Sequence, residues 1–393
     1  MKIGLVLPAI PAYSETFFVN KIKGLQAHGH EVILFVHAKT GQSSFEGAKI
    51  KTSPKYGKSI SGTVKALGQL LMVLGHVGSI LRFYRLERKE GITALTILKR
   101  IVTNSHLLSA QLDWLHFGFG TMALERENIP GAIRAKMAVS FRGFDYYVYP
   151  VKNPGCYTRL FSKAVTYHVL SEGMKKGLVA QGIPDASIVK ITPAIDVSKF
   201  SANTTAKPVQ EQVTIITVAR LHWIKGLEYT LEALALLKQK GFSFRYTIVG
   251  DGPEKERLLF AAHQLGIADH VVLTGKITPD EVRRKLEESS LYLQYSIQEG
   301  FCNAVLEAQA MGKLCIVSDA EGLTENIIDG STGYVVAKRN PVSLANKIAE
   351  VLSLTAEEQE EIAGNAADRI RKEFSIQGQL KQFARFYEGH QEN

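Results

Sequence analysis

Cysteine is scarce in this sequence of 393 residues, which contains only Cys156, Cys302 and Cys315, no two of them closely spaced. This scarcity excludes the disulfide framework of a small secreted domain and the paired cysteines of a structural zinc site. Long apolar runs are also missing. The most apolar stretch after the N-terminus, Ala66–Leu81, is interrupted by three polar residues, whereas a membrane-spanning helix needs ~20 mostly apolar residues. We therefore expect a chain from a reducing, cytoplasmic compartment, with no metal site and no transmembrane segment.

Strand and helix patterns alternate along the chain, with glycine at the junctions. The opening segment KIGLVLP predicts a first strand rather than a signal peptide, and a helix and a second strand follow it. The polar, unpatterned stretch Asp196–Gln212 predicts a linker, after which the same alternation starts again. We predict an α/β protein with two doubly wound, Rossmann-like domains that face each other across a cleft. The predicted domains are 1–200 and 201–375, and 376–393 is predicted to form a C-terminal helix that packs back on the N-terminal domain.

Positive charge is concentrated in the first half of the sequence. Residues 1–205 contain 26 Lys and Arg against 12 Asp and Glu, whereas residues 206–393 contain 21 against 26. This imbalance predicts an anionic partner for the first half, either nucleic acid or an anionic membrane surface, with ordinary solubility charge as the alternative. Residues 55–89 add an apolar helical pattern to basic surroundings. Such a pattern is typical of a helix lying on a bilayer, and equally of a helix packed on a core.

Two cations follow the first predicted strand of the second domain, in the stretch VARLHWIKG. Arg220 and Lys225 are five positions apart in a loop that Gly226 closes. Arg binds a phosphate as a fork and Lys as a point charge, so the pair indicates a diphosphate site, although two exposed surface cations have the same pattern. The later stretch IVGDGPEKER lacks the third glycine of a dinucleotide fingerprint, because Lys255 stands there. We interpret it as a tight strand-to-helix turn near a nucleotide rather than as an NAD site.

The stretch QEGFCNAVLEAQAMGK contains two glutamates eight positions apart, Glu299 and Glu307. Glu299 follows a predicted buried strand, and Gly300 permits a tight turn and a close approach of the backbone to a ligand. A helix is predicted to start near Asn303, and the amides at its N-terminus favour an anion such as phosphate. Glu307, inside that helix, can accept two hydrogen bonds from a ribose diol. The alternative is a surface Glu299 and a solvated Glu307, which the apolar neighbours of Glu307 disfavour.

The first domain also places polar residues near predicted strand ends. His116 ends the strand of LHFGFG, and Arg142 and Asp145 follow a strand in FRGFD. Loops after parallel strands often carry function, so we expect His116 to face the second domain across the cleft, although a lone histidine is more often structural. Ser14 and Glu15, in the N-terminal loop, are candidates for the cleft as well.

Together these stretches resemble the family 4 glycosyltransferases, which have the GT-B fold. EGFCNAVLE matches their Glu-x7-Glu motif, and VARLHWIKG matches their arginine–lysine diphosphate loop. SETFFVNKIKGL resembles the branch that builds bacterial exopolysaccharides of the colanic-acid type, and SDAEGLTENIIDGSTGYVV is the usual continuation after the motif. The resemblance covers almost the whole chain and is strongest over residues 213–336.

The resemblance implies a role for each matching position and needs no bound metal or cofactor. The implied catalytic residues are His116, Glu299, Arg220 and Lys225, of which the two cations hold the donor diphosphate and Glu299 orients the donor sugar. The implied donor-binding residues are Gly275 and Ile277 near the base, Gly300, Phe301, Cys302, Asn303 and Val305 near the sugar and phosphates, and Glu307 on the ribose. The residues assigned to the acceptor or the cleft are Ser14, Glu15, Arg142 and Asp145.

The predicted activity is retaining transfer of a hexosyl group from a nucleotide-diphosphate sugar of the UDP or GDP type. The predicted acceptor is a hydroxyl of a glycan or a polyprenyl-diphosphate-linked glycan in bacterial surface polysaccharide synthesis. The chain is then expected in the cytoplasm, peripheral on the inner face of the cell membrane, with an anionic membrane surface rather than nucleic acid as its partner. Two alternatives stay open. One is another GT-B enzyme, a sugar-nucleotide epimerase or a phosphorylase; the other is a nucleotide- or polyanion-binding module without catalysis.

Overall fold

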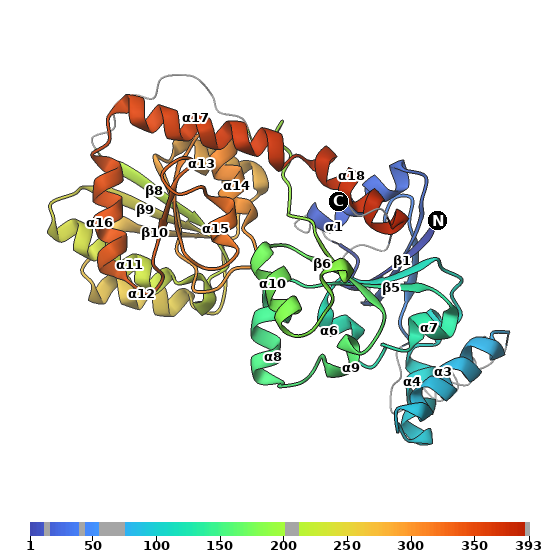
Figure 1. Ribbon diagram of the computed structural model, residues 1–393. Coiled ribbons are helices and arrows are strands. Elements are labelled where there is room, and N and C mark those ends of the chain that lie inside the picture. Colours follow the sequence, from blue (N-terminus) through green and yellow to red (C-terminus); the bar gives the residue numbers. More distant parts are fainter. Residues whose placement is uncertain (12–15, 39–43, 55–74, 201–211, 390–393) are drawn as a thin grey trace. The chain divides into compact units, whose positions relative to one another are not determined.

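The computed structural model describes residues 1–11, 16–38, 44–54, 75–200 and 212–389. These residues form two compact units (Figure 1). The first unit takes in the described residues up to Leu170, Met174–Ile191 and the chain from Leu380 onward, and the second takes in Ser171–Gly173 and Thr192–Gln379. Each unit has a parallel sheet with helices packed on it, which confirms the predicted α/β fold with two doubly wound units.

The first unit contains a sheet of seven strands in the order β3-β2-β1-β4-β5-β6-β7, with every neighbouring pair parallel. Its strands are β1 (Lys2–Ala9), β2 (Glu31–Ala38), β3 (Lys49–Thr52), β4 (Trp114–Phe117), β5 (Lys136–Ser140), β6 (Val165–Val169) and β7 (Ile188–Lys190). Its helices are α1 (Thr16–Ala27), α3 (Val77–Lys89), α4 (Ala94–Thr103), α5 (Ser105–Leu108), α6 (Gly120–Ala123), α7 (Ile129–Ile133), α8 (Tyr149–Lys152), α9 (Thr158–Phe161) and α10 (Glu172–Ala180).

The core of the first unit lies where α1 and the last helix cover the central strands. The middle of β1 is buried residue after residue, as expected for a parallel strand with helices on both faces. Helix α18 (Ile376–Glu388) contributes Phe383, Phe386 and Tyr387 to this core, beside Trp114 of β4. The indole nitrogen of Trp114 donates a hydrogen bond to the carbonyl oxygen of Tyr387 at 3.0 Å. The end of the chain is therefore part of the first folded unit.

The second unit contains a parallel sheet of six strands in the order β10-β9-β8-β11-β12-β13. Its strands are β8 (Val213–Val218), β9 (Phe244–Val249), β10 (Val271–Gly275), β11 (Leu291–Gln294), β12 (Leu314–Ser318) and β13 (Tyr334–Val336). Its helices are α11 (Leu227–Gln239), α12 (Lys255–Gln264), α13 (Pro279–Glu288), α14 (Asn303–Ala310), α15 (Leu323–Asn326), α16 (Pro341–Leu352) and α17 (Ala356–Glu373).

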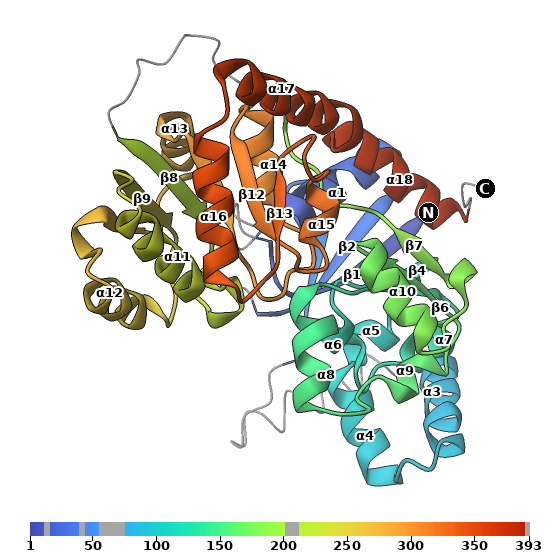
Figure 2. The same cartoon turned by 60° about the vertical axis from the view of Figure 1, so that its left-hand side comes forward.

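Helices cover both faces of the second sheet (Figure 2). One face packs against α11, α12 and α16, and the other against α13, α14 and α15. Helices α13 and α17 of this unit each begin with a capping box. The side chains of Thr278 and Thr355 accept hydrogen bonds from the amides of Glu281 and Glu358, whose carboxylates accept from the threonine amides in return. These local hydrogen bonds explain why α13 begins directly after Thr278 and α17 directly after Thr355.

Two predictions for the first unit, the N-terminal cleft residues and the basic 55–89 segment, concern residues that the structure describes only in part. Ser14 and Glu15 lie outside the described residues, and so does the first part of the 55–89 segment. The end of that segment forms α3, which packs against α7 through the fully buried Phe83. Among the described residues, no helix combines the length and apolar character that crossing a membrane requires.

Candidate functional site

The chain reverses its direction of winding in the second sheet between β8 and β11. The chain proceeds outward from β8 through β9 and β10 on one side, and returns to place β11, β12 and β13 on the other. In open parallel sheets, ligands bind outside the carboxyl ends of the strands at such a point. The loops that leave β8 and β11 carry the predicted cations and the predicted glutamate. The topology therefore brings Arg220, Lys225 and Glu299 to one end of the sheet.

Backbone contacts hold the two loops together. The amide of Ile297 donates to the carbonyl oxygen of Ile224 at 2.8 Å, which joins the β11 loop to the β8 loop. Gly226, in the left-handed region with φ 61°, closes the β8 loop. A Cβ atom at Gly226 would lie 2.1 Å from the carbonyl oxygen of Tyr295, so only glycine permits this approach.

Lys225 and Glu299 form an ion pair across these loops. Both side chains are largely buried, and the Lys225 ammonium donates to a carboxylate oxygen of Glu299. Burial is the largest single influence and lowers the pKa of Lys225, but the charge of Glu299, the nearby Cys302 and the hydrogen bond to Glu299 together raise it by more, so the pKa lies above its usual value and the ammonium stays charged. The sequence assigned these residues to different parts of a ligand and did not predict that they pair. Arg220 is exposed at the same strand end, where its charge acts on Lys225.

A hydrogen-bonded chain along β11 orients the Glu299 carboxylate. The hydroxyl of Tyr292 donates to Gln294, the Gln294 amide donates to Ser296 at 2.9 Å, and the Ser296 hydroxyl donates to Glu299 at 3.2 Å. All three donor residues are fully buried. Sequence reasoning missed them, although Gln294 and Ser296 in an otherwise apolar strand, at alternate positions on one face, were a signal for such a chain.

The turn between β11 and α14 is fixed by a second contact that the sequence did not predict. The Asn326 side chain accepts a hydrogen bond from the amide of Cys302 and donates one to the carbonyl oxygen of Cys302, both at 3.1 Å. Gly322 also approaches this turn, where a Cβ atom would lie 2.2 Å from the carbonyl oxygen of Gly300. The Cys302 amide is therefore occupied by Asn326 and is not free to bind a ligand, and burial raises the pKa of the Cys302 thiol to about 12.

Glu307 lies one turn inside α14, as predicted, and Asn303 is the first residue of that helix. Its carboxylate has no hydrogen-bond or ion-pair partner within the described parts of the chain. Burial raises the pKa of this carboxyl to about 7. A half-buried acceptor without a protein partner is suited to hydroxyl donors of a ligand.

The pKa of Glu307 predicts a pH-dependent stability difference. A carboxyl whose pKa is raised by folding stabilises the protein below its ordinary pKa of about 4.5, and this contribution is lost as the pH rises through about 7. We expect Glu307→Gln to become more stable relative to wild type by about 1–2 kcal/mol between pH 5 and pH 8, less than the full shift would give because the side chain is partly exposed. Urea unfolding at both pH values measures the difference, and a difference that does not change with pH would contradict the assignment.

The remaining predicted donor-binding residues lie near the same end of the sheet, but not all of them have a side chain that a ligand could reach. The side chain of Val305 is fully buried and packs in the core under α14, and its part in donor binding stays a prediction. Phe301 is buried against Phe374, with ring centroids 5.7 Å apart. Gly275 and Ile277 follow β10, and the carbonyl oxygen of Gly275 accepts a hydrogen bond from Gly250 at 3.0 Å.

His116 lies in the interior of the first unit. It is fully buried, with Ser140 2.7 Å from one ring nitrogen and the Tyr387 hydroxyl 2.6 Å from the other, on which Lys21 also converges at 3.3 Å. His168 continues the chain, 2.8 Å from the Ser140 hydroxyl. Burial and the nearby Lys21 lower the pKa of His116, so the ring is neutral. In this structure His116 has no exposed surface and fastens β4 to β5 and α18, and its contact with a donor sugar stays a prediction.

Arg142 and Asp145 also pack inside the first unit. The Arg142 guanidinium lies over the rings of Phe17 and Phe18, 4.1 and 4.6 Å from their centroids. Asp145 is buried and accepts hydrogen bonds from the amides of Gly120 (2.5 Å) and Arg142 (2.8 Å). Burial raises the pKa of Asp145 to about 7, although these hydrogen bonds oppose the rise. Asp145 thus ties two loops together instead of facing an acceptor.

Comparisons with known proteins identify the class to which this arrangement belongs. Residues 202–369 match the family described as glycosyl transferases group 1. The chain is 26% identical to the putative colanic acid biosynthesis glycosyltransferase WcaL of Escherichia coli over 96% of this chain and 97% of that protein. It is 24% identical to the amylovoran biosynthesis glycosyltransferase AmsK of Erwinia amylovora, over 88% and 89% of the two chains.

The fold is also that of solved glycosyltransferases. HepE of Anabaena, solved in complex with UDP and glucose, superposes with a TM-score of 0.73 at 15% identity, over 99% of this chain and 100% of that one. The two parallel-sheet units thus constitute a GT-B fold. The part of the chain that matches the group 1 glycosyltransferase family contains both motifs, around Arg220 and Glu299, and the chain is similar to glycosyltransferases over most of its length.

Proposed function

We propose that this glycosyltransferase transfers a hexosyl group, with retention, from a nucleotide-diphosphate sugar to a hydroxyl of a glycan or a lipid-linked glycan. The observation that carries the proposal is the site at the switch point of the second sheet. There Lys225 is held against an oriented Glu299, the N-terminus of α14 follows, and the carboxylate of Glu307 has no protein partner among the described residues. A carboxylate for the sugar, a cation and helix amides for the diphosphate, and an acceptor for the ribose thus match the three connected parts of a nucleotide-diphosphate sugar.

The chemistry of the step follows from where charge develops. The bond between C1 of the sugar and the diphosphate oxygen breaks, C1 gains oxocarbenium character, and the diphosphate takes the electron pair. Arg220, Lys225 and the N-terminus of α14 stabilise this negative charge. The acceptor oxygen bonds to C1, and its proton passes to the departing diphosphate. Glu299 is held by Ser296 and Lys225, so its role is to orient the sugar rather than to attack it.

The names of the relatives support the acceptor class. WcaL and AmsK are described as enzymes of colanic acid and amylovoran biosynthesis, and both resemble this chain over most of its length. We therefore infer an acceptor that is a growing surface polysaccharide, carried on a polyprenyl diphosphate, and a place of action on the cytoplasmic side of the cell membrane. The basic first half of the chain suits such an anionic carrier.

Thermal unfolding in the presence of a panel of UDP- and GDP-sugars tests the donor class. A ligand at 100 times its dissociation constant stabilises the folded state by about 2.7 kcal/mol, so the true donor should raise Tm clearly. NAD serves as the control because two glycines of a dinucleotide fingerprint are present at Gly250 and Gly252. Stabilisation by NAD alone, or by no nucleotide sugar, would contradict the proposal.

Product analysis separates the proposal from its alternatives. Incubation of the stabilising donor with a lipid-linked oligosaccharide should give transfer to that acceptor. An epimerase would convert the nucleotide sugar without an acceptor, and a phosphorylase would need inorganic phosphate. Donor binding without turnover on any acceptor would instead favour the binding module.

A further inference from the structure

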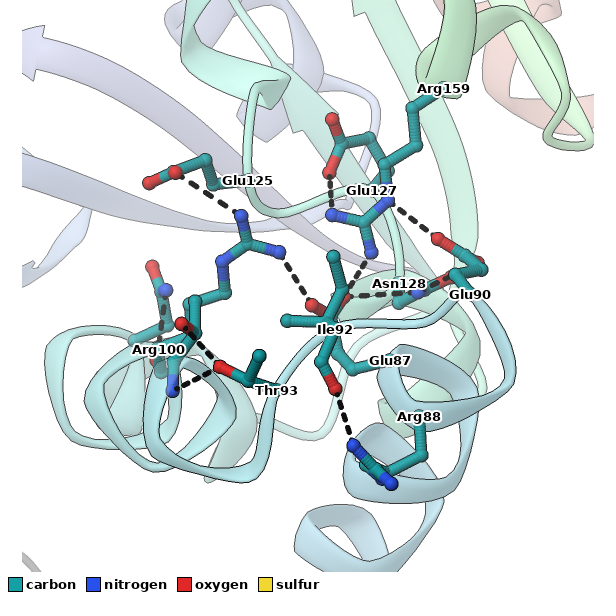
Figure 3. Close-up of polar contacts among 12 residues, drawn as sticks. Glu87, Arg88, Glu90, Ile92, Thr93, Arg100, Glu125, Glu127, Asn128 and Arg159 are labelled. Carbon is teal, nitrogen blue, oxygen red and sulfur yellow. Dashed lines mark hydrogen bonds and ion pairs between the residues drawn. The ribbon is translucent and has the colours of Figure 1, made fainter.

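A buried ion-pair cluster fixes the orientation of α3 and α4 in the first unit (Figure 3). Its centre is Glu87 of α3, which is fully buried and accepts hydrogen bonds from Arg100 of α4 (2.6 Å), Asn128 (3.0 Å) and Arg159. Arg100 also reaches Glu125, at 3.1 Å. The cluster joins both helices to the body of the unit.

A second acidic residue, Glu90, belongs to the same ion-pair cluster. Glu90, the residue after α3, pairs with Arg159 at 2.6 Å and with Lys163, and accepts from Asn128 at 2.9 Å. Burial alone would raise the pKa of Glu90, but the hydrogen bonds from these partners lower it to about 2, so it is ionised. Both carboxylates are thereby neutralised by arginine and lysine, Glu87 in the interior and Glu90 at its partly exposed edge.

The outer face of the two helices consequently carries charge of one sign. On α3 the exposed positions are spaced by three and four residues and include Val77, Leu81, Arg85, Arg88 and Lys89. On α4 they include Leu95 and Leu98, which are 65% and 54% exposed, and Lys99. Within the described parts of the chain, no acidic side chain pairs with any of these four cations.

We propose that this outer face of α3 and α4, the residues named in the preceding paragraph, docks on an anionic lipid surface. Exposed leucines among unpaired cations match a surface that is apolar below and negative at its headgroups, whereas a helix packed on a protein core would bury those leucines. Burial of Glu87 and the pairing of Glu90 with Arg159 and Lys163 neutralise the carboxylates that such a surface would repel. This inference rests on the proposed function and deepens it. Docking on the membrane would place the enzyme beside a lipid-linked acceptor.

Co-sedimentation with vesicles tests the proposal directly. We expect the wild-type chain to bind vesicles of phosphatidylcholine and phosphatidylglycerol in equal parts at low salt, not to bind phosphatidylcholine alone, and to be released by salt. The triple variant R85E/K89E/K99E should lose at least ten-fold in bound fraction at limiting lipid. The double variant L95S/L98S should keep the lipid-charge dependence and lose several-fold. Circular dichroism melts show whether the variants fold.

A matched control separates a docking face from general charge. The triple variant K152E/K176E/K372E changes the net charge by the same amount at exposed lysines elsewhere, and it should bind nearly as wild type does. Equal losses in both triple variants, or no binding of the wild-type chain to the mixed vesicles, would overturn the proposal. The assay contains no substrate, so a failure of the proposed transferase activity would appear in the donor and product assays and not here.

Discussion

Arg220→Ala is expected to lower kcat by about 10²–10³ while leaving the fold intact. Removing one preformed group that stabilises charge in a transition state typically costs this much in rate. The Arg220 side chain is exposed at the carboxyl end of β8, so its removal opens no cavity and leaves no buried charge behind. Steady-state transfer kinetics with the donor found by thermal unfolding measure the effect, and an unchanged Tm without ligand confirms the fold.

The matched control is Arg245→Ala, another exposed arginine in the same sheet. Arg245 lies within β9, opposite Thr214 of β8 and away from the strand ends that carry Lys225 and Glu299. Its removal changes the charge equally and should leave kcat within about two-fold of wild type, because surface substitutions away from a site have small effects. If Arg220→Ala and Arg245→Ala are equally active, Arg220 does not stabilise the leaving diphosphate.

Glu87→Gln is expected to lower the free energy of unfolding of the first unit by about 3 kcal/mol. Removing one member of a buried ion pair is costly because the partner charge loses its compensation. Here both Arg100 and Arg159 would lose their common carboxylate, although Glu125, Glu90 and Glu127 still offer each of them a second partner. Urea unfolding followed by Trp114 fluorescence, in a Trp223→Phe background, reports on this unit, since Trp114 is buried beside α18.

Glu31→Gln is the control for Glu87→Gln. Glu31 pairs with Lys49 at 2.8 Å on the surface of the same unit, where the median ion pair contributes about 0–1 kcal/mol. A loss in Glu87→Gln no larger than that in Glu31→Gln would show that the cluster does not stabilise the unit, and α3 and α4 would need another anchor.

Local patterns predicted the second unit better than the first. The helix that starts at Asn303 and the loop around Lys225 depend on residues close in sequence, and the structure has both of them where they were predicted. In the first unit, strand-end position alone suggested that His116 and Asp145 face a ligand. Their burial depends on α18 and α6, which lie far away in sequence or are too short to predict.

The sequence by itself determined the class of the fold, the order of its elements and the pair of motifs through which it resembles the glycosyltransferases, because periodicity, capping and loop glycines act over a few residues. Only the tertiary structure decided which charged groups are available. Desolvation and hydrogen bonding depend on neighbours from distant segments: Ser296 and Lys225 hold Glu299, Asn326 occupies the Cys302 amide, and Glu307 has no partner among the described residues. The same long-range pairing holds Glu87 in the interior, and Arg85, Arg88, Lys89 and Lys99 then have no acidic partner in the described parts of the chain.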